Sequence, residues 1–239
     1  MPGVRGNATA GPGGGPRVVI LQVNLNRNRA AQDLLTQTTA AQRAGILIVS
    51  EPSGAGKQGS WLVDRWGDAA ITATNNLPGT FTLEGRGEGF VWARTSGFTI
   101  FSCYFSPNVA ISDFMAQLDD LETIIRSTRG RIIVAGVFNA KSPSWGSSQL
   151  DKRGQAVAEL LARLDLLPIN EGSASTWQRA SLGSSSVIDL TAGTLGIAVE
   201  MTGWRVLEDE SLSDHRYIFM VWTPRTRPRA RTPCSIEKG

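Results

Sequence analysis

The fold class follows from residues 17–51, which read RVVILQVNLNRNRAAQDLLTQTTAAQRAGILIVSE. Arg17 to Val23 is a nearly continuous run of β-branched and other apolar residues, which predicts a strand. Arg29 to Arg43 contains no proline and predicts a helix, and Ile46 to Ser50 predicts a second strand that ends at Glu51. A strand, a helix and a strand in this order form an α/β unit, so we predict an α/β fold.

The rest of the chain predicts more strands and two more helices. Short strands separated by Gly, Pro and Asn are expected at 69–74, 80–83, 89–94 and 98–105, with antiparallel pairing. One helix is expected to begin at Ser112 as its N-cap and to end near Gly130, and a second to span about 154–166. Later strands are expected at 131–136, 186–191, 204–207 and 217–222.

Composition limits the class of protein. The chain has 239 residues, of which 41% are hydrophobic, enough to bury the core of one large domain. The net charge of +3 is compatible with an anionic partner but does not require one. Two cysteines and one histidine exclude a disulfide framework and a tetrahedral zinc site, and they fit a reducing compartment. No apolar run approaches the length that spans a membrane, so we expect no membrane partner.

Shifts in composition suggest three parts. Residues 1–16 are rich in Gly and Pro and predict a flexible leader. Residues 17–223 hold all the predicted elements and form one domain. Residues 224–239 are rich in Arg and Pro and predict a tail or linker, which either contacts phosphate or is simply solvated.

Polar residues follow or precede several of the predicted strands. The single histidine, His215, precedes the strand at 217–222, while Asn24, Glu51, Asn139 and Asp189 stand at or near the ends of four others. Open α/β sheets place their sites at such an edge. Each residue also has a structural interpretation, the asparagines as turn formers, Asp189 as a strand-end cap and Tyr104 as a core residue.

These side chains suit phosphate chemistry. Glu51 and the amide of Asn24 offer hard oxygen ligands, the kind that bind Mg²⁺ or Mn²⁺ together with substrate phosphates. Asp189 and His215 can form a carboxylate–imidazole pair that favours the imidazolium, which stabilises charge on a phosphoryl oxygen. Tyr104 and Asn139 add hydrogen-bond donors.

Six short motifs together carry a resemblance to a known superfamily. They are LQVN (21–24), SEP (50–52), CYFSP (103–107), GVFNAKS (136–142), SVIDLT (186–191) and SDH (213–215). In order and rough spacing they resemble the endonuclease/exonuclease/phosphatase superfamily, over about residues 17–222. Within it, the chain looks most like the endonuclease domains of non-LTR retrotransposons, especially those that insert into ribosomal RNA genes.

The resemblance implies a fold and a reaction. The fold would be a four-layer α/β sandwich of two packed mixed β-sheets flanked by helices, as in DNase I. The activity would be Mg²⁺-dependent nicking of double-stranded DNA in the nucleus, at a ribosomal RNA gene. The nick would leave a 3′-hydroxyl that primes reverse transcription, and the chain would be fused to a reverse transcriptase.

The same resemblance implies a role for each site residue. Glu51 would be the principal metal ligand, with help from Asn24 and Asp214. Asn139 and Tyr104 would bind the scissile phosphate and the nucleophile. His215, oriented by Asp189, would stabilise the transition state.

The chain departs from the family pattern at two positions. Val137 stands where the family has an Asp that orients or deprotonates the attacking water, a role typically worth about 10²–10⁴-fold. We interpret Val137 as an inactivating change, the alternative being a strand-end residue in a site with a different base. Asn26 stands where many relatives have an Asp, which predicts weaker metal binding.

Residues for DNA recognition are expected in the loops. Candidates combine cations with aromatic side chains, which suit groove contacts and stacking. They are Lys57 and Arg65 near Trp61 and Trp66, Trp177 with Arg179, and Lys141. The alternative, that tryptophans belong to the core, fits Trp92 and Trp222 better, because both lie within predicted strands.

Three other functions stay open. An apurinic/apyrimidinic repair endonuclease would use the same scaffold and the same site. A phosphatase of small phosphorylated ligands fits the arginine-rich tail less well. A catalytically silent DNA-binding module is consistent with Val137, because the phosphate-binding residues remain while the expected base is missing.

Overall fold

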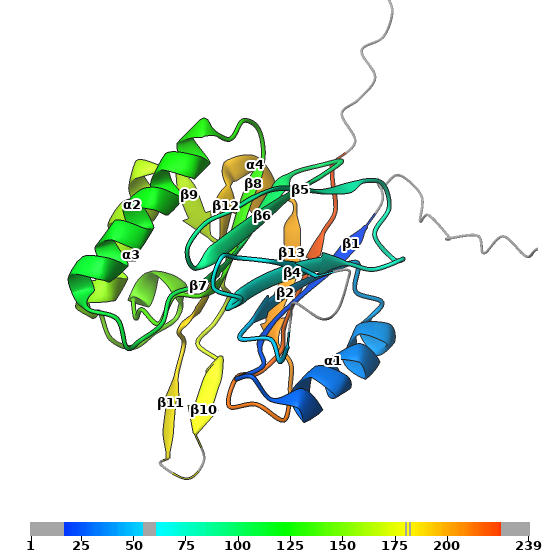
Figure 1. Ribbon diagram of the computed structural model, residues 1–239, viewed down its shortest axis with the longest axis horizontal. Coiled ribbons are helices and arrows are strands. Elements are labelled where there is room, and N and C mark those ends of the chain that lie inside the picture. Colours follow the sequence, from blue (N-terminus) through cyan, green and yellow to red (C-terminus); the bar gives the residue numbers. More distant parts are fainter. Residues whose placement is uncertain (1–16, 55–60, 180, 182, 226–239) are drawn as a thin grey trace, which may run out of the picture.

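The computed structural model describes residues 17–54, 61–179, 181 and 183–225, which form two six-stranded mixed sheets packed face to face (Figure 1). The first sheet has the order β13 (Met201–Val206), β14 (Ile218–Trp222), β1 (Val18–Asn24), β2 (Ile46–Ser50), β4 (Ala69–Ala73) and β3 (Leu62–Val63). The second has the order β5 (Phe81–Arg86), β6 (Phe90–Thr95), β7 (Thr99–Tyr104), β8 (Ile132–Val137), β12 (Asp189–Thr194) and β9 (Leu166–Pro168). β1 pairs with β2, and β7 with β8, in parallel.

Helices cover the outer faces of the two sheets. α1 (Arg29–Gln42) packs on the first sheet, while α2 (Ile111–Ser127) and α3 (Lys152–Arg163) pack on the second (Figure 1). A short helix α4 (Leu195–Ala198), a 3₁₀ turn (Pro143–Trp145) and a hairpin of β10 (Trp177–Arg179) with β11 (Ser184–Ser186) complete the fold. The predicted four-layer sandwich is confirmed. None of the helices in the described residues has the length and apolarity that a bilayer crossing requires.

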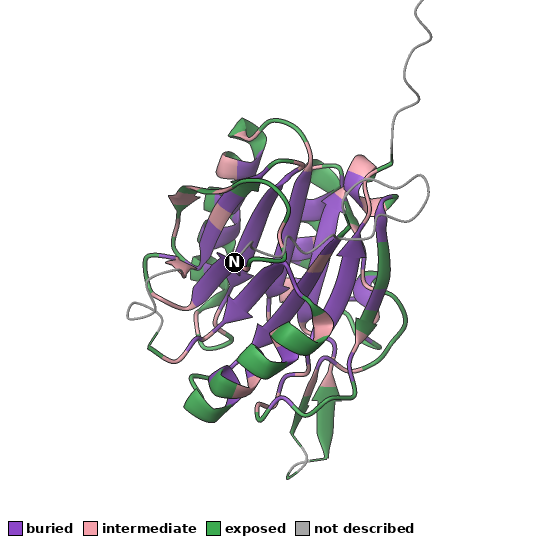
Figure 2. Ribbon diagram, turned by 90° about the vertical axis from the view of Figure 1, so that its right-hand side faces the viewer, coloured by how far each residue is buried: buried purple, intermediate pink, exposed green. Residues whose placement is uncertain are grey.

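The side chains of each strand point alternately to the two faces of its sheet, which explains how the sheets and helices form layers. In β1, Ile20 faces the other sheet, whereas Leu21 and Val23 pack toward α1. Successive side chains of a strand point to opposite faces, so a continuous apolar run indicates a strand buried on both sides. Figure 2 shows buried residues along the strands, with exposed residues on the outer side of the helices.

Several predicted boundaries were wrong. α2 begins at Ile111 after Ala110, and Ser112 bonds the neighbouring Asp113 instead of capping the helix. α2 ends at Ser127, not near Gly130, and α3 starts at Lys152 because the side chain of Asp151 accepts a hydrogen bond from the amide of Gly154. A side-chain cap accounts for the start of α3, whereas Ala110, the N-cap of α2, makes no side-chain hydrogen bond. Sequence patterns resolve such boundaries poorly.

One strand prediction also needs correction. The strand expected at 186–191 is split, since β11 ends at Ser186 and β12 begins at Asp189. The predicted antiparallel pairing is confirmed for β5, β6 and β7 with one another, and for β4, which pairs with β2 and β3 in the first sheet. The predicted leader, 1–16, and residues 226–239 of the predicted tail lie outside the described residues.

Gly136 occupies a position in β8 that only glycine fits. Its φ is +139°, and a Cβ atom there would lie 1.9 Å from the carbonyl oxygen of Cys103 on β7. We therefore expect Gly136→Ala to lower the free energy of unfolding by about 2–4 kcal/mol, measured by urea denaturation.

Gly130 provides the matched control, because its φ is +96° but a Cβ atom added there would have no neighbour within 4 Å. Gly130→Ala should cost only about 1 kcal/mol of backbone strain. Equal losses in the two variants would contradict the proposed clash.

Candidate active site

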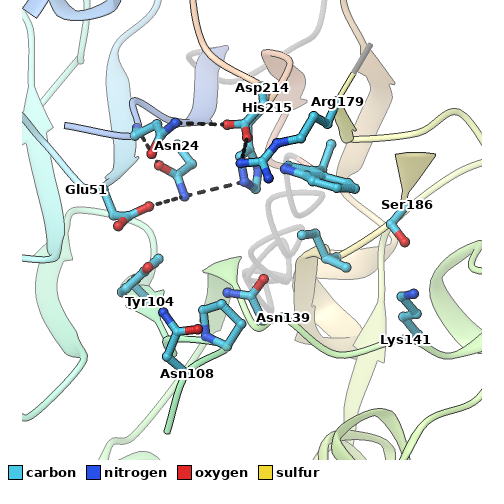
Figure 3. Close-up of a pocket in the computed structure, with 14 residues that line it drawn as sticks. Asn24, Glu51, Tyr104, Asn108, Asn139, Lys141, Arg179, Ser186, Asp214 and His215 are labelled. Atoms are coloured by element: carbon cyan, nitrogen blue, oxygen red, sulfur yellow. Dashed lines mark hydrogen bonds and ion pairs between the residues drawn. The ribbon is translucent and has the colours of Figure 1, made fainter. Parts of the chain in front are cut away.

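A cleft of about 560 Å³ lies where the ends of β1, β2, β7 and β8 meet the start of β12 (Figure 3). Strands from both sheets and the β10–β11 hairpin contribute to its walls. The lining residues are Asn24, Asn26, Glu51, Tyr104, Pro107, Asn108, Asn139, Lys141, Trp177, Arg179, Ser186, Ile188, Asp214 and His215. The structure therefore brings most of the predicted site residues to one place.

Asn24 lies between Glu51 and His215 at one end of the cleft. It ends β1, and its side chain is buried. Its Oδ1 accepts a 2.7 Å hydrogen bond from the amide of Asn26. Its Nδ2 donates to Oε2 of Glu51 at 2.9 Å and lies 3.5 Å from Nε2 of His215 (Figure 3). Asn24 therefore orients the Glu51 carboxylate as well as contributing to the cleft wall.

Glu51 follows β2 in a left-handed backbone conformation, with φ of +46°. This conformation is costly for a residue other than glycine, and it persists where the surrounding structure enforces it. The amide of Glu51 donates to the carbonyl of Asp68, and its own carbonyl accepts from the amide of Arg27. The guanidinium of Arg27 pairs with Asp68 and lies 3.9 Å from Glu51. Neither Arg27 nor Asp68 was predicted, because neither belongs to a motif.

His215 and Asp189 form the predicted pair. Nδ1 of His215 lies 3.0 Å from Oδ2 of Asp189, and both side chains are buried. Thr176, which is fully buried, donates a 2.6 Å hydrogen bond to the same carboxylate. With Nδ1 directed at Asp189, Nε2 faces the cleft. Thr176 was not predicted, because its contact with Asp189 forms only through tertiary packing.

The surroundings of His215 favour its protonated form. Burial alone would lower its pKa, but the charge and hydrogen bond of Asp189, with Asp214 and Glu51 nearby, outweigh burial and raise the pKa above its usual value. These surroundings shift the protonation equilibrium of His215 toward the imidazolium, the form that can stabilise an oxyanion.

The opposite wall carries Tyr104, Asn108 and Asn139. Burial and the neighbouring Glu51 carboxylate raise the pKa of Tyr104, so its hydroxyl stays protonated and can donate a hydrogen bond. Asn139 has a left-handed backbone, with φ of +49°, and its Nδ2 donates to the carbonyl of Phe105 at 3.0 Å. Asn108 was not among the predicted residues, although it directly follows the CYFSP motif.

Val137 lies beneath the cleft and does not line it. It is buried, and it pairs in register with Tyr104 on β7 and with Asp189 on β12. Side chains that are paired across neighbouring strands share one face of the sheet. The side chain of Val137 therefore lies between two site residues, in the position the resemblance assigns to a general base.

The β10–β11 hairpin projects from the body of the fold (Figure 1), and its residues Trp177, Arg179 and Ser186 line the cleft. Trp177 forms a β-bridge with His215, and the amide of Gln178 donates to the carbonyl of Asp214. A guanidinium nitrogen of Arg179 lies 3.7 Å from the Asp214 carboxylate, and about half of the Arg179 side chain is exposed. The predicted Trp177 and Arg179 thus stand at the cleft, on an element bonded to the His215 segment.

Arg65, one of the predicted DNA-binding residues, does not join the cleft. Arg65 lines a separate recess with Arg86 and Trp92, between β5, β6 and α2. Lys57 lies outside the described residues. Lys141, in contrast, lines the cleft (Figure 3).

The donor set at the cleft fits a hard divalent cation. Within the described ranges, no group of three or more His, Cys, Asp or Glu side chains has the geometry of a metal site. Glu51 and Asp214 supply carboxylates, and Asn24 and Asn26 supply amides. Mg²⁺ commonly binds through one or two carboxylates, several waters and substrate phosphates, so this sparse set suits it.

Comparison with known proteins gives the family. A family model described as endonuclease-reverse transcriptase matches residues 98–219, just over half of the chain. The chain belongs to this endonuclease–reverse transcriptase family. The matched residues include Tyr104, Asn139, Asp189 and His215, which lie at the cleft or directly beneath it.

Two relatives refine the family assignment. The endonuclease domain of TRAS1, a telomere-specific non-LTR retrotransposon, is 28% identical with a TM-score of 0.71, covering 87% of this chain and 98% of that domain. A probable RNA-directed DNA polymerase from transposon X-element of Drosophila melanogaster is 29% identical over 101 residues, which make up 41% of this chain and 11% of that protein. The prediction of an endonuclease domain similar to those of non-LTR retrotransposons is confirmed, whereas its preference for ribosomal RNA genes stays a prediction.

Two apurinic endonucleases share the fold. One from Archaeoglobus fulgidus has a TM-score of 0.67 at 14% identity, covering 86% of this chain and 99% of that one. One from Leishmania major has a TM-score of 0.64 at 11% identity, covering 87% and 88%. At this identity the likeness concerns the fold of the endonuclease–reverse transcriptase domain alone.

Replacing Asp189 tests the electrostatics of the pair. Asp189→Asn removes the charge that raises the pKa of His215, so we expect that pKa to fall, measured by NMR titration of the ring in metal-free protein. In the unchanged chain, the raised pKa of His215 means that its protonated form stabilises the fold. This stabilisation is fully present below the pKa of about 6.5 that His215 has in the unfolded chain, and it is lost as pH rises through the pKa of His215 in the folded chain. Asp33→Asn, at an exposed position of α1, is the control. The same His215 pKa in both variants would argue against the pairing.

Proposed function

We propose that this chain is the divalent-metal-dependent endonuclease unit of a non-LTR retrotransposon. It nicks one strand of double-stranded DNA and leaves a 3′-hydroxyl that primes reverse transcription. One observation carries the proposal: Glu51 and the His215–Asp189 pair face Tyr104 and Asn139 across a single cleft, although they come from five segments of the chain.

The residues around Glu51 provide the metal-binding end. A Mg²⁺ or Mn²⁺ ion held by Glu51 and Asp214, with Asn24, would polarise the scissile phosphate and ease departure of the leaving oxygen. Asn24 keeps the Glu51 carboxylate in place through its 2.9 Å hydrogen bond. Asn26 donates to Asp214 at 3.3 Å and takes the position at which many relatives have a carboxylate. The weaker metal binding predicted for Asn26 is part of this proposal.

The other residues act on the phosphate directly. His215, held by Asp189 and favoured as the imidazolium, donates from Nε2 to a phosphoryl oxygen as negative charge develops there. The protonated Tyr104 hydroxyl and the second N–H of Asn139 donate to other phosphate oxygens. Fixed donors of this kind cost no reorganisation during the reaction, because the fold already holds them in place.

Val137 reduces the reaction in this chain. A valine neither orients the attacking water nor accepts its proton, and the adjacent carboxylate of Asp189 is already engaged by His215 and Thr176. The phosphate-binding groups remain intact. The chain therefore binds DNA as an endonuclease would but cleaves it slowly.

The proposal extends to the domain to which the chain is fused, the compartment in which it acts and its DNA target. We propose that residues 17–223 form the catalytic unit, that the chain is fused to a reverse transcriptase, and that it acts in the nucleus on a ribosomal RNA gene. The X-element relative supports the fusion, since its name describes an RNA-directed DNA polymerase. The motifs from Tyr104 to Pro107 and from Phe138 to Gly146 support the ribosomal target.

Restoring an acid at position 137 tests the catalytic assignment. We expect Val137→Asp to increase nicking by roughly 10²-fold or more in Mg²⁺, because a general base contributes at least that much. The assay follows conversion of supercoiled to nicked plasmid, with and without an inserted ribosomal RNA gene. Glu51→Gln in the same background should abolish the gain.

Other outcomes separate the alternatives. Cutting confined to a duplex with one abasic analogue would favour a repair endonuclease. Mg²⁺-independent DNA binding without any restored nicking would favour a silent binding module. No preference for the ribosomal insert would remove the target assignment but leave the nuclease.

Arg179 is expected to contact the DNA next to the cleft. In the Val137→Asp background, Arg179→Ala should weaken DNA binding and lower the slope of log affinity against log salt by about one if Arg179 binds a phosphate. The Mg²⁺ dependence should stay unchanged. Arg94→Ala is the control, because Arg94 is an exposed arginine that pairs with Glu84 on the neighbouring strand of the second sheet. Equal affinity for the two variants would count against a role for the hairpin in binding.

A further inference from the structure

The first turn of α3 lies behind two loops that carry cleft residues. One loop, residues 105–110, connects β7 to α2 and contributes Pro107 and Asn108 to the cleft. The other, residues 138–142, follows β8 and contributes Asn139 and Lys141. The helical turn itself stands outside the set of described residues that line the cleft.

Arg153, in this turn, holds the first loop through three contacts. Its two terminal nitrogens donate to the carbonyl of Ser106 at 2.8 Å and to the carbonyl of Val109 at 2.9 Å. Its guanidinium carbon lies 4.5 Å from the centre of the Phe114 ring on α2. One planar group thus satisfies two backbone carbonyls and stacks on an aromatic ring, so it fixes the loop against both helices.

The neighbouring residues of the turn hold the second loop. Oδ1 of Asp151 accepts hydrogen bonds from the amides of Lys141 and Gly154, at 3.2 and 2.6 Å. The amide of Asp151 donates to the carbonyl of Lys141 at 3.1 Å. A Cβ atom on Gly154 would lie 1.7 Å from that carbonyl oxygen, so the approach is too close for any other residue. The same turn therefore fixes both loops.

The first loop in turn orients the amide of Asn139. Phe105 donates its amide to the carbonyl of Val137 and accepts a 3.0 Å hydrogen bond from Nδ2 of Asn139. A side-chain amide nitrogen has two hydrogens. With one of them directed at Phe105, the plane of the amide is set, and the other hydrogen and the oxygen are left for the cleft.

We propose that Arg153 is a positioning residue of the nuclease site, which acts through the 105–110 loop and the carbonyl of Phe105 to orient Asn139 toward the scissile phosphate. The effect of Arg153 on catalysis rests on the endonuclease function proposed above. Its structural part, that Arg153 restrains the loop, is independent of any activity.

Lysine cannot replace arginine in this role. The two carbonyl oxygens are held by separate nitrogens of a rigid planar group, whereas an ammonium is a single point donor on a flexible stem. Arg163, on the same helix, is a matched control, because its guanidinium binds Glu122 of α2, at a distance from both loops along the helix.

The experiment compares Arg153→Met, Arg153→Lys and Arg163→Met in the Val137→Asp background. We expect both Arg153 variants to lower kcat about 10- to 100-fold, since small misplacements of a catalytic contact have effects of that size. The dissociation constant for duplex DNA should change by less than about threefold, because most phosphate contacts remain. Arg163→Met should keep both values close to those of the background.

Hydrogen exchange gives a readout that does not depend on nicking. In Arg153→Met the amides of residues 105, 106, 108–110 and 139 should exchange about tenfold faster or more, while those of the sheet core keep their protection. Arg163→Met should leave the loop protected.

The outcomes separate this inference from the proposed function. If the Val137→Asp protein does not nick DNA, the endonuclease assignment is contradicted. The restraint of the 105–110 loop by Arg153 can still be tested in that case, and unchanged hydrogen exchange of the loop in Arg153→Met would overturn it. Nicking at the background rate by either Arg153 variant overturns the positioning role. If Arg153→Met fails to fold, Arg153→Lys decides, since it keeps the charge and the stem: full activity overturns the proposal, and lowered kcat with unchanged DNA binding supports it.

Discussion

The arrangement of the site depends on one buried amide that joins the two sheets. Gln22, on β1, donates from Nε2 to the carbonyl of Gly136 on β8 at 3.1 Å. Its Oε1 accepts a 3.2 Å hydrogen bond from Thr191 on β12, whose hydroxyl oxygen also accepts from the indole of Trp204. These groups are buried, and an unpaired polar group there would be costly. Apolar contacts between the sheets are not directional, whereas the hydrogen bonds of this network are satisfied in one placement of the two sheets relative to each other.

Each partner of that network stands next to a residue of the site. Asn24 follows Gln22 by two residues on the same face of β1, Val137 follows Gly136, and Asp189 precedes Thr191 by two. Because Gln22 fixes the two sheets relative to each other, it also fixes the ends of β1, β8 and β12 that lie at the cleft. The core between the sheets is mostly apolar, so the site residues lie where that core meets solvent. This location explains how His215 is buried and still lines the cleft.

The sequence by itself determined the class of fold and selected most of the residues that the structure brings to the cleft. Apolar runs with strand and helix periods predicted most elements, because one-sided or two-sided burial leaves a local pattern. Asn24, Glu51 and His215 could be selected because they end or precede such runs and because one histidine left no alternative. Val137 could be recognised as unusual only by comparing the GVFNAKS motif with the family pattern, which has an Asp at this position. Helix starts, the break between β11 and β12 and the sheet to which β4 belongs were missed, since capping and pairing involve residues outside a local window.

Only the tertiary structure decided which residues support the site. Thr176 bonds Asp189, Arg27 and Asp68 adjoin Glu51, and Arg153 holds the loop beside Asn139. No spacing in the chain signals these contacts. The structure also placed Arg65 in a different recess and Arg179 at the cleft, although both combine a cation with nearby tryptophans in the sequence. The physical reason is range: periodicity records which face of an element is buried, whereas a hydrogen bond between distant segments depends on how whole sheets and helices pack.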